Sequence, residues 1–310
     1  MDYAPLPSMS LSMSLSMSLA LQRTLHWVGS GLALTGIAFV ALRLHEYWGS
    51  LVLSQITPVA WVAVAGLAML YGMANLLLAL AWWQLLAQFG VQVTRLWSIR
   101  VYGVSQLAKY VPGNIFHLAG RQAIGMAAGA SSGALARSTL WELSLIALGG
   151  MLYGWLVLPL LTPGFPSLAS IILLLGTVWV VAYLLCRFIG SQVSVSFGWQ
   201  MLFLAVSGGV FVTLLDVIVR SSELHPQTWL LIGGAYVVAW LVGLVTPGAP
   251  AGVGVRELIL LLLLKGLVTD ADLLMAVLLG RIVTVVGDLL FFMASFLIPA
   301  KLCLLEENHE

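Results

Sequence analysis

Charged residues are scarce in this chain of 310 residues: they make up 8% of it, whereas 61% of the residues are hydrophobic. Soluble domains carry about a quarter charged residues, so the composition predicts an integral membrane protein with little water-soluble mass. Lys and Arg total 13 against 12 Asp and Glu. This near balance argues against nucleic acid as a partner, because nucleic-acid binding needs a basic surface.

Cysteine is almost absent as well. Cys186 and Cys303 are the two in the chain, and neither has a Cys or His neighbour at metal-ligand spacing, so neither a disulfide framework nor a metal site is predicted. The sequence also lacks a Walker-type loop, a metal-binding Asp pair and a nucleophile constellation. We therefore expect no cofactor and no catalytic residue.

Long apolar stretches dominate what is present. A spanning helix needs about 20 mostly apolar residues, and an all-α polytopic fold with about eight such helices is predicted. The spans are expected near residues 24–42, 58–86, 133–158, 167–186, 199–219, 227–246, 251–269 and 271–298. The seventh is the weakest and could be half of a re-entrant hairpin, because its apolar centre is short.

The spans divide the chain into three parts. Residues 1–22 contain a Met/Leu-Ser alternation and are expected to be disordered, 23–300 form one membrane domain, and 301–310 form a short tail. The segment 87–132 is too polar for a span and predicts an amphipathic or re-entrant helix stopped at a proline, then a second short helix. Lys and Arg in the short loops favour cytoplasmic termini, and Lys109 is read as part of that cytoplasmic positive face.

One short motif occurs twice in the sequence: Pro-Gly, followed by an Arg nine residues after the Pro. The offsets from Pro112 to Arg121 and from Pro247 to Arg256 are 121 − 112 = 9 and 256 − 247 = 9. Matching helix breaks in two halves of a membrane protein point to a polar site at mid-membrane, and they suggest a two-fold internal repeat. The expected break positions are Pro112, Gly113, Pro247, Gly248, Gly252 and Gly254.

Polar side chains accompany these breaks. A charge at the bilayer centre costs about 3 kcal/mol or more, so each one needs a reason. The candidate residues for binding a lipid headgroup are Asn114, His117, Arg121, Gln122, Arg256, Glu257 and Arg281, and the supporting charges are Arg137, Glu142 and Asp288. The Arg fork binds phosphate in a bidentate manner, and the carboxylates could hold the Arg side chains when no ligand is bound.

Plainer interpretations stay open. Arg281 and Asp288 are seven residues apart on one helix face, so they could form a purely structural ion pair. A lone His such as His117 is more often simply hydrogen-bonded than a proton shuttle, and each Pro-Gly copy by itself could be an ordinary turn.

The two Pro-Gly segments resemble a known family. Pro247–Glu257, followed by an apolar run and Arg281, is similar to the Pro-Gly-Gly-x-Gly-x-x-Glu signature of the lysylphosphatidylglycerol synthase/flippase transmembrane domain. Lys109–Asn114 with Arg121 looks like that family's other recognisable segment. The resemblance implies a re-entrant, eight-helix domain that moves a lipid between leaflets, with polar cavity residues at Asn114, Arg121, Arg256, Glu257 and Arg281. The loop is looser here than in the signature.

Three functions therefore remain as hypotheses. The leading one is a lipid flippase of a bacterial inner membrane that binds an anionic or sugar-bearing headgroup. The family's aminoacyltransferase domain has no counterpart in the short tail 301–310, so aminoacyl transfer is not expected. The alternatives are a membrane-embedded transferase acting on a lipid-linked sugar or phosphate, with a base such as Glu142, Glu257 or His117, and a non-catalytic scaffold of an envelope lipid biosynthesis complex.

Overall fold

The computed structural model describes residues 42, 58–111, 116–162, 164–219, 226–246 and 254–299, and over these residues the fold is helical without a strand. Six helical stretches are long and apolar enough to cross a membrane. They are α2 (Pro58–Gln88), α5 (Ser132–Leu152) with its extension through η3 (Tyr153–Val157) and α6 (Leu158–Leu161), α7 (Ser167–Phe188), α8 (Ser191–Val219), α9 (Pro226–Val245) and α11 (Asp270–Phe296). The predicted polytopic helical membrane protein is thus confirmed in its coarse form.

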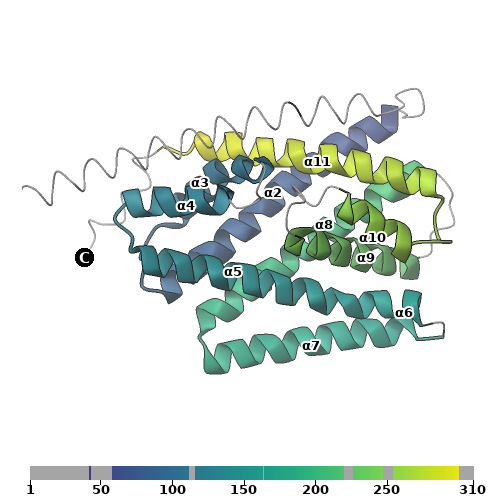
Figure 1. Cartoon of the computed structure of the whole chain (residues 1–310), viewed down its shortest axis with the longest axis horizontal. Helices are drawn as coiled ribbons and strands as arrows, with labels where there is room; N and C mark the ends of the chain where they lie inside the picture. Colours follow the sequence, from purple (N-terminus) through teal and green to yellow (C-terminus); the bar gives the residue numbers. More distant parts are fainter. Residues whose placement is uncertain are drawn as a thin grey trace, which may run out of the picture.

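The long helices pack around α2. This helix contacts α8, α11, α5 and the short helix α3 (Arg95–Gln106), and Figure 1 shows it crossing obliquely between α5 and α11. At the crossing with α11 a Cβ added to Gly72 would lie 2.9 Å from the carbonyl oxygen of Gly287. Only glycine at both positions allows the two backbones to come so close. The outermost long helix is α7, which presents Trp179, Tyr183 and other large apolar side chains outward.

Four shorter elements complete the described fold: α3, η2 (Leu107–Tyr110), α4 (Phe116–Ala127) and α10 (Val255–Leu263). The predicted pair of short helices within 87–132 is present as α3–η2 and α4. Helix α4 packs on α3 and α5, and α10 packs on α9 and α11. Figure 1 shows α3 and α4 toward the left end of the long helices and α9 and α10 toward the right end.

The turns after α4 and α10 are built alike. Gly129 (φ 90°) follows α4 and Gly266 (φ 83°) follows α10, and both take the left-handed backbone that favours glycine. Each next helix then begins with a hydroxyl cap: Ser131 Oγ accepts from the Ala134 amide and Thr269 Oγ1 from the Asp272 amide. These caps satisfy amide groups that the first helical turn leaves unpaired. Each short helix is therefore firmly joined to a long one.

The count of spans differs from the prediction. The first predicted span, 24–42, lies outside the described residues except for Leu42. The seventh, 251–269, contains α10, whose nine residues are too few to cross a bilayer. The reason is local, because the apolar run is bounded by Gly254 (φ 84°) and Gly266. Both glycines break the helix before it reaches spanning length. The other six predicted spans correspond to the six long helices.

Candidate functional site

A cavity of about 130 Å³ lies inside the bundle, where the short helices from the two ends approach each other. Its volume suits a compact group, since an engineered cavity of about 150 Å³ binds a molecule the size of benzene. Its polar and charged lining consists of Tyr71, Tyr102, Gln106, Lys109, Tyr110, His117, Arg121, Glu142, Arg256, Arg281 and Thr284. Four of these are cationic, and they come from η2, α4, α10 and α11.

Arg121 forms the first group of contacts, which we name the α4–α5 cluster (Trp82, Tyr102, Arg121 and Glu142). Arg121 is 2% exposed, and its Nη1 and Nη2 lie 3.0 and 2.9 Å from the two carboxylate oxygens of Glu142. The guanidinium carbon lies 4.4 Å from the ring centre of Tyr102 and 5.2 Å from that of Trp82. Arg121 is thus held by a bidentate carboxylate and by aromatic rings, which together stabilise a buried guanidinium.

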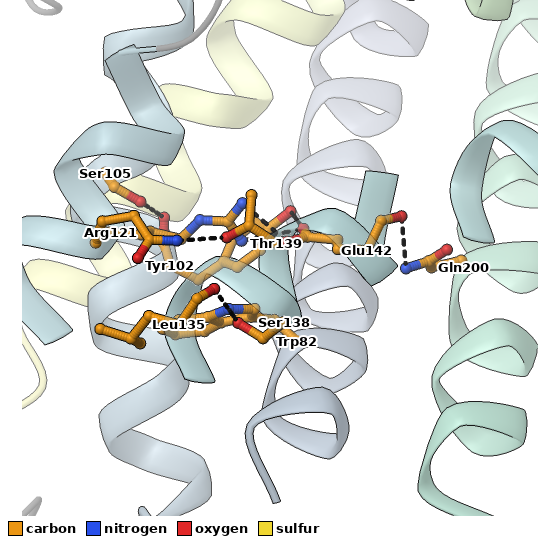
Figure 2. A network of polar contacts seen from close by, with 10 residues as sticks. Trp82, Tyr102, Ser105, Arg121, Leu135, Ser138, Thr139, Glu142 and Gln200 are labelled. Carbon is orange, nitrogen blue, oxygen red and sulfur yellow. Dashed lines mark hydrogen bonds and ion pairs between the residues drawn. The ribbon is translucent and has the colours of Figure 1, made fainter. Parts of the chain in front are cut away.

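Further hydrogen bonds fix this cluster from several helices. The Tyr102 hydroxyl donates to Glu142 Oε1 at 3.0 Å, and Gln200 Nε2 donates to the Glu142 carbonyl at 3.4 Å. The Trp82 indole donates to Ser138 Oγ at 3.2 Å. Figure 2 shows these side chains converging from neighbouring helices, with Gln200 approaching Glu142 from the side opposite Arg121. The cluster is therefore anchored by α2, α3, α4, α5 and α8 together.

The second group, the α10–α11 cluster, consists of Tyr236, Arg256, Glu257 and Arg281. Arg281 donates from Nε and Nη2 to Glu257 Oε1, at 3.2 and 2.9 Å, and the Glu257 side chain is 24% exposed. Arg256 is buried, with its guanidinium carbon 5.7 Å from the ring centre of Tyr236. Burial lowers the pKa of Arg256, and the neighbouring charge of Arg281 lowers it further. The two guanidinium groups therefore repel each other, and an anion between them would relieve that repulsion.

Glu257 is the carboxylate of this cluster. Burial alone would raise the pKa of Glu257, but the charge and hydrogen bonds of Arg281 outweigh burial and hold that pKa below its ordinary value. Glu257 is therefore an anion at neutral pH. Its Oε2 atom is buried and has no hydrogen-bond partner among the described residues.

The third group, the Asp288 cluster, consists of Asn75, Gln106, Lys109, Tyr110 and Asp288. Asp288 is 0% exposed; its Oδ1 accepts from Asn75 Nδ2 at 3.1 Å and from Gln106 Nε2 at 3.4 Å. Its Oδ2 accepts from the Tyr110 hydroxyl and lies 2.6 Å from Lys109 Nζ. Lys109 itself lines the cavity. The lysine assigned above to a cytoplasmic face is therefore an inward-facing residue.

His117 lies on α4 one turn before Arg121 and also lines the cavity. Burial lowers the pKa of His117 well below its ordinary value, and the charges of Arg121 and Lys109 lower it further. The imidazole is consequently neutral at neutral pH and acts as a hydrogen-bonding group. Its Nδ1 atom is buried and has no hydrogen-bond partner among the residues the structure describes.

The remaining sequence candidates separate into three groups. Gln122 lies outside the cavity lining and donates to Thr139 Oγ1 at 2.9 Å, which joins α4 to α5. Arg137 is exposed and donates to the Gly133 carbonyl, so it does not support the cavity. Asn114, Pro112, Gly113, Pro247, Gly248 and Gly252 lie outside the described residues, whereas Gly254 is the N-cap residue of α10.

The three supporting carboxylates do not all pair with arginine, as the sequence suggested they could. Glu142 holds Arg121 and Glu257 holds Arg281, but Asp288 holds Lys109 rather than an arginine. The alternative left open above, a structural ion pair between Arg281 and Asp288, does not form: Arg281 pairs with Glu257 and Asp288 with Lys109. Seven residues along a helix correspond to a rise of about 10 Å, so the two side chains share a face yet each meets a partner from another helix.

The sequence interpretation also missed several residues of the site. Tyr71, Tyr102, Gln106 and Trp240 line the cavity, and Asn75 supports it. Asn75 did carry a signal, because it is an amide in the middle of an uncharged apolar helix and intramembrane polar residues are rare without a role. Comparison of the chain with family models, with curated proteins and with solved structures gave no match.

Proposed function

We propose that this protein is a lipid translocase that holds the anionic or glycosylated headgroup of a membrane lipid in the cavity. The observation that carries the proposal is the cavity lining: Lys109, Arg121, Arg256 and Arg281 reach one buried space from both Pro-Gly segments. Cationic side chains are costly within a membrane domain unless they serve a ligand or a partner. A phosphate or other anion in the cavity would use several of them at once.

The arrangement of the short helices supports transport rather than static binding. Helices α3 and α4 lie toward one end of the long helices, and α10 lies toward the other (Figure 1). In the proposed topology α3 and α4 form one re-entrant hairpin and α10 belongs to a second, as parts of a two-fold inverted repeat within about eight spans. Inverted repeats that meet at a central site allow alternating access, because one unit can move while the other stays in place.

The lining also suggests which part of the lipid enters. A cavity of about 130 Å³ accommodates a headgroup but leaves no room for acyl chains, which would remain in the hydrocarbon along the outer faces of the bundle. The Arg281 charge lowers the pKa of Arg256, which means that the two guanidinium groups lie near each other, and Arg can bind phosphate with two parallel hydrogen bonds. We assign the phosphate to these two residues, with Arg121 as part of the cavity wall and Glu257 and Asp288 as positioning groups.

The resemblance to the lysylphosphatidylglycerol synthase/flippase transmembrane domain agrees with this assignment and is part of the proposal. It favours a bacterial inner membrane, cytoplasmic termini and a membrane lipid as the partner. The alternative of a membrane-embedded transferase has less support, because Glu142 and Glu257, two of its candidate bases, are both occupied by arginine.

The test is translocation in reconstituted vesicles. Wild-type protein is placed in liposomes with fluorescently labelled phosphatidylglycerol, labelled phosphatidylcholine or a labelled neutral glycolipid, and an impermeant quencher reports label that reaches the outer leaflet. We expect the wild type to accelerate movement of phosphatidylglycerol or of the glycolipid above that of phosphatidylcholine. Arg256→Ala should lower this rate at least tenfold by removing a headgroup contact.

Arg137→Ala is the matched control, because it removes the same side chain and charge from the exposed surface of α5. It should move lipid like the wild type. Equal rates for wild type and Arg256→Ala, at equal amounts of folded protein, would refute the proposed role of the cavity. Wild-type vesicles that behave like empty ones with every lipid would refute the translocase function itself.

A further inference from the structure

Lys109 occupies a different position from the other three cations of the cavity. It lies at the end of η2, three residues before Pro112, and its Nζ is 2.6 Å from a carboxylate that is 0% exposed, while its own side chain is 20% exposed. It also lines the cavity. A single ammonium group therefore borders both a buried anion and the space proposed for the headgroup.

Asp288 accepts hydrogen bonds from three side chains besides its ion pair with Lys109. Asn75, Gln106 and Tyr110 all donate to its two oxygens, so three neutral hydrogen bonds would remain if Lys109 moved away. Among the described residues, Glu142 without Arg121 would keep the Tyr102 hydroxyl as its one side-chain donor. Because several hydrogen bonds stabilise a buried carboxylate in its charged form, Asp288 can lose its cation at a lower cost than Glu142 can.

The side chains differ in the same direction. Arg121 is fixed by a planar fork and by rings at 4.4 and 5.2 Å, whereas Lys109 carries a point charge on a flexible four-carbon stem. An ammonium group can change partners by rotating about single bonds, without breaking a bidentate geometry. The neighbouring Tyr110 stays attached to Asp288 through its own hydroxyl.

We propose that the Lys109 ammonium exchanges between Asp288 and the phosphate of the bound headgroup, and that Asp288 is the competing anion which takes Lys109 back when the ligand leaves. This inference rests on the proposed function, since it assigns a release step to the same cavity. Binding would pull Lys109 from Asp288 toward the phosphate. Release would restore the original ion pair, with no net change in the protein's charge.

The exchange predicts that removing the Asp288 charge raises the affinity for the lipid and lowers the rate of translocation. In Asp288→Asn the side chain keeps nearly the same shape, but Lys109 has no competing anion. Phosphatidylglycerol should then bind about tenfold more tightly and be translocated several-fold more slowly. A merely structural Asp288 would give weaker binding or less folded protein, because its loss would loosen α2, α3 and α11 together.

Binding is measured by calorimetric titration of purified wild type, Asp288→Asn and Asp270→Asn with short-chain phosphatidylglycerol, and rates are measured in the vesicle assay. Asp270→Asn is the control, because it makes the same change on the same helix at an exposed first-turn position. It should match the wild type in affinity and rate. Unchanged or weaker binding by folded Asp288→Asn would overturn the exchange.

A second variant keeps the test decisive if Asp288→Asn does not fold. Lys109→Gln should weaken phosphatidylglycerol binding about tenfold and leave the binding of a short-chain neutral glycolipid, which has no phosphate, unchanged; wild-type affinity for phosphatidylglycerol in this variant would overturn the exchange. Glycerol phosphate is titrated in parallel to distinguish a soluble phosphate from a lipid. If wild type bound neither lipid nor glycerol phosphate, the proposed function would fail together with this inference.

Discussion

The two short helices and the long helices that follow them carry the same kind of ion pair with the charges exchanged. On α4 and α5 the arginine belongs to the short helix and the glutamate to the long one, as Arg121 and Glu142. On α10 and α11 the glutamate belongs to the short helix and the arginine to the long one, as Glu257 and Arg281. Opposite charges thus join each short helix to its long partner, although the order of the charges is reversed.

The two pairs differ most in how completely protein surrounds them. Arg121 is 2% exposed and contacts two rings, and its carboxylate partner has a second donor in Tyr102. The Glu257 side chain is 24% exposed, and among the described residues its carboxylate accepts from Arg281 without a second side-chain donor. Under the proposed function, the α4–α5 half is then a fixed wall, and the α10–α11 half is the part that adjusts to a ligand.

The difference between the two ion pairs is tested most strongly by neutralising each glutamate in turn. Glu142→Gln would leave the Arg121 charge buried without a carboxylate, and such a loss typically costs about 3–5 kcal/mol of unfolding free energy. Glu257→Gln also leaves a buried guanidinium, that of Arg281, but the Glu257 side chain is 24% exposed, so the loss should be smaller, about 1–3 kcal/mol. Thermal unfolding of both variants in one detergent measures the difference. Equal losses would show that the two halves are equally rigid.

The sequence alone indicated the cavity arginines but not the difference in burial between the two ion pairs. The repeated Pro-Gly-Arg spacing pointed to one polar site, and Arg121 and Arg256 both line one cavity. Such a site can be proposed from sequence because helix breaks and charges in apolar segments are visible in a single sequence. The difference in burial between the two ion pairs was not predictable, since it depends on rings and donors supplied by α2, α3 and α8.

Lys109 shows the limit most clearly. On sequence it follows Arg95 and Arg100 along an amphipathic segment, and that pattern is typical of a solvated cationic face. The structure turns it inward, because η2 tightens the last turn before Pro112 and Lys109 meets an aspartate 179 residues later, 288 − 109 = 179. A contact between residues so far apart in the sequence cannot be predicted from the local pattern of apolar and polar residues.

A smaller effect should come from the second donor of the α4–α5 cluster. Tyr102→Phe removes the hydroxyl that donates to Glu142 Oε1 at 3.0 Å and keeps the ring beside Arg121. Loss of a hydrogen bond to a buried charged acceptor should cost about 1.5–3 kcal/mol. Tyr183→Phe is the control, because Tyr183 is exposed on α7 and should lose almost nothing. An equal, near-zero change in both variants would mean that Arg121 alone holds Glu142.

The smallest predicted effect concerns salt, and it separates the two halves without altering the cavity wall. The Glu257–Arg281 pair is partly open to water, and the Debye length falls from about 10 Å at 0.1 M to about 3 Å at 1 M salt. The stability difference between wild type and Glu257→Gln should therefore be smaller in 1 M salt than at low salt. The difference for Tyr102→Phe should stay constant, because ions do not reach Glu142. Thermal unfolding midpoints of the three proteins across a salt series measure both trends. If the Glu257→Gln difference were insensitive to salt, Glu257 would be shielded as well as Glu142 is, and the α10–α11 half would not be the adjustable one.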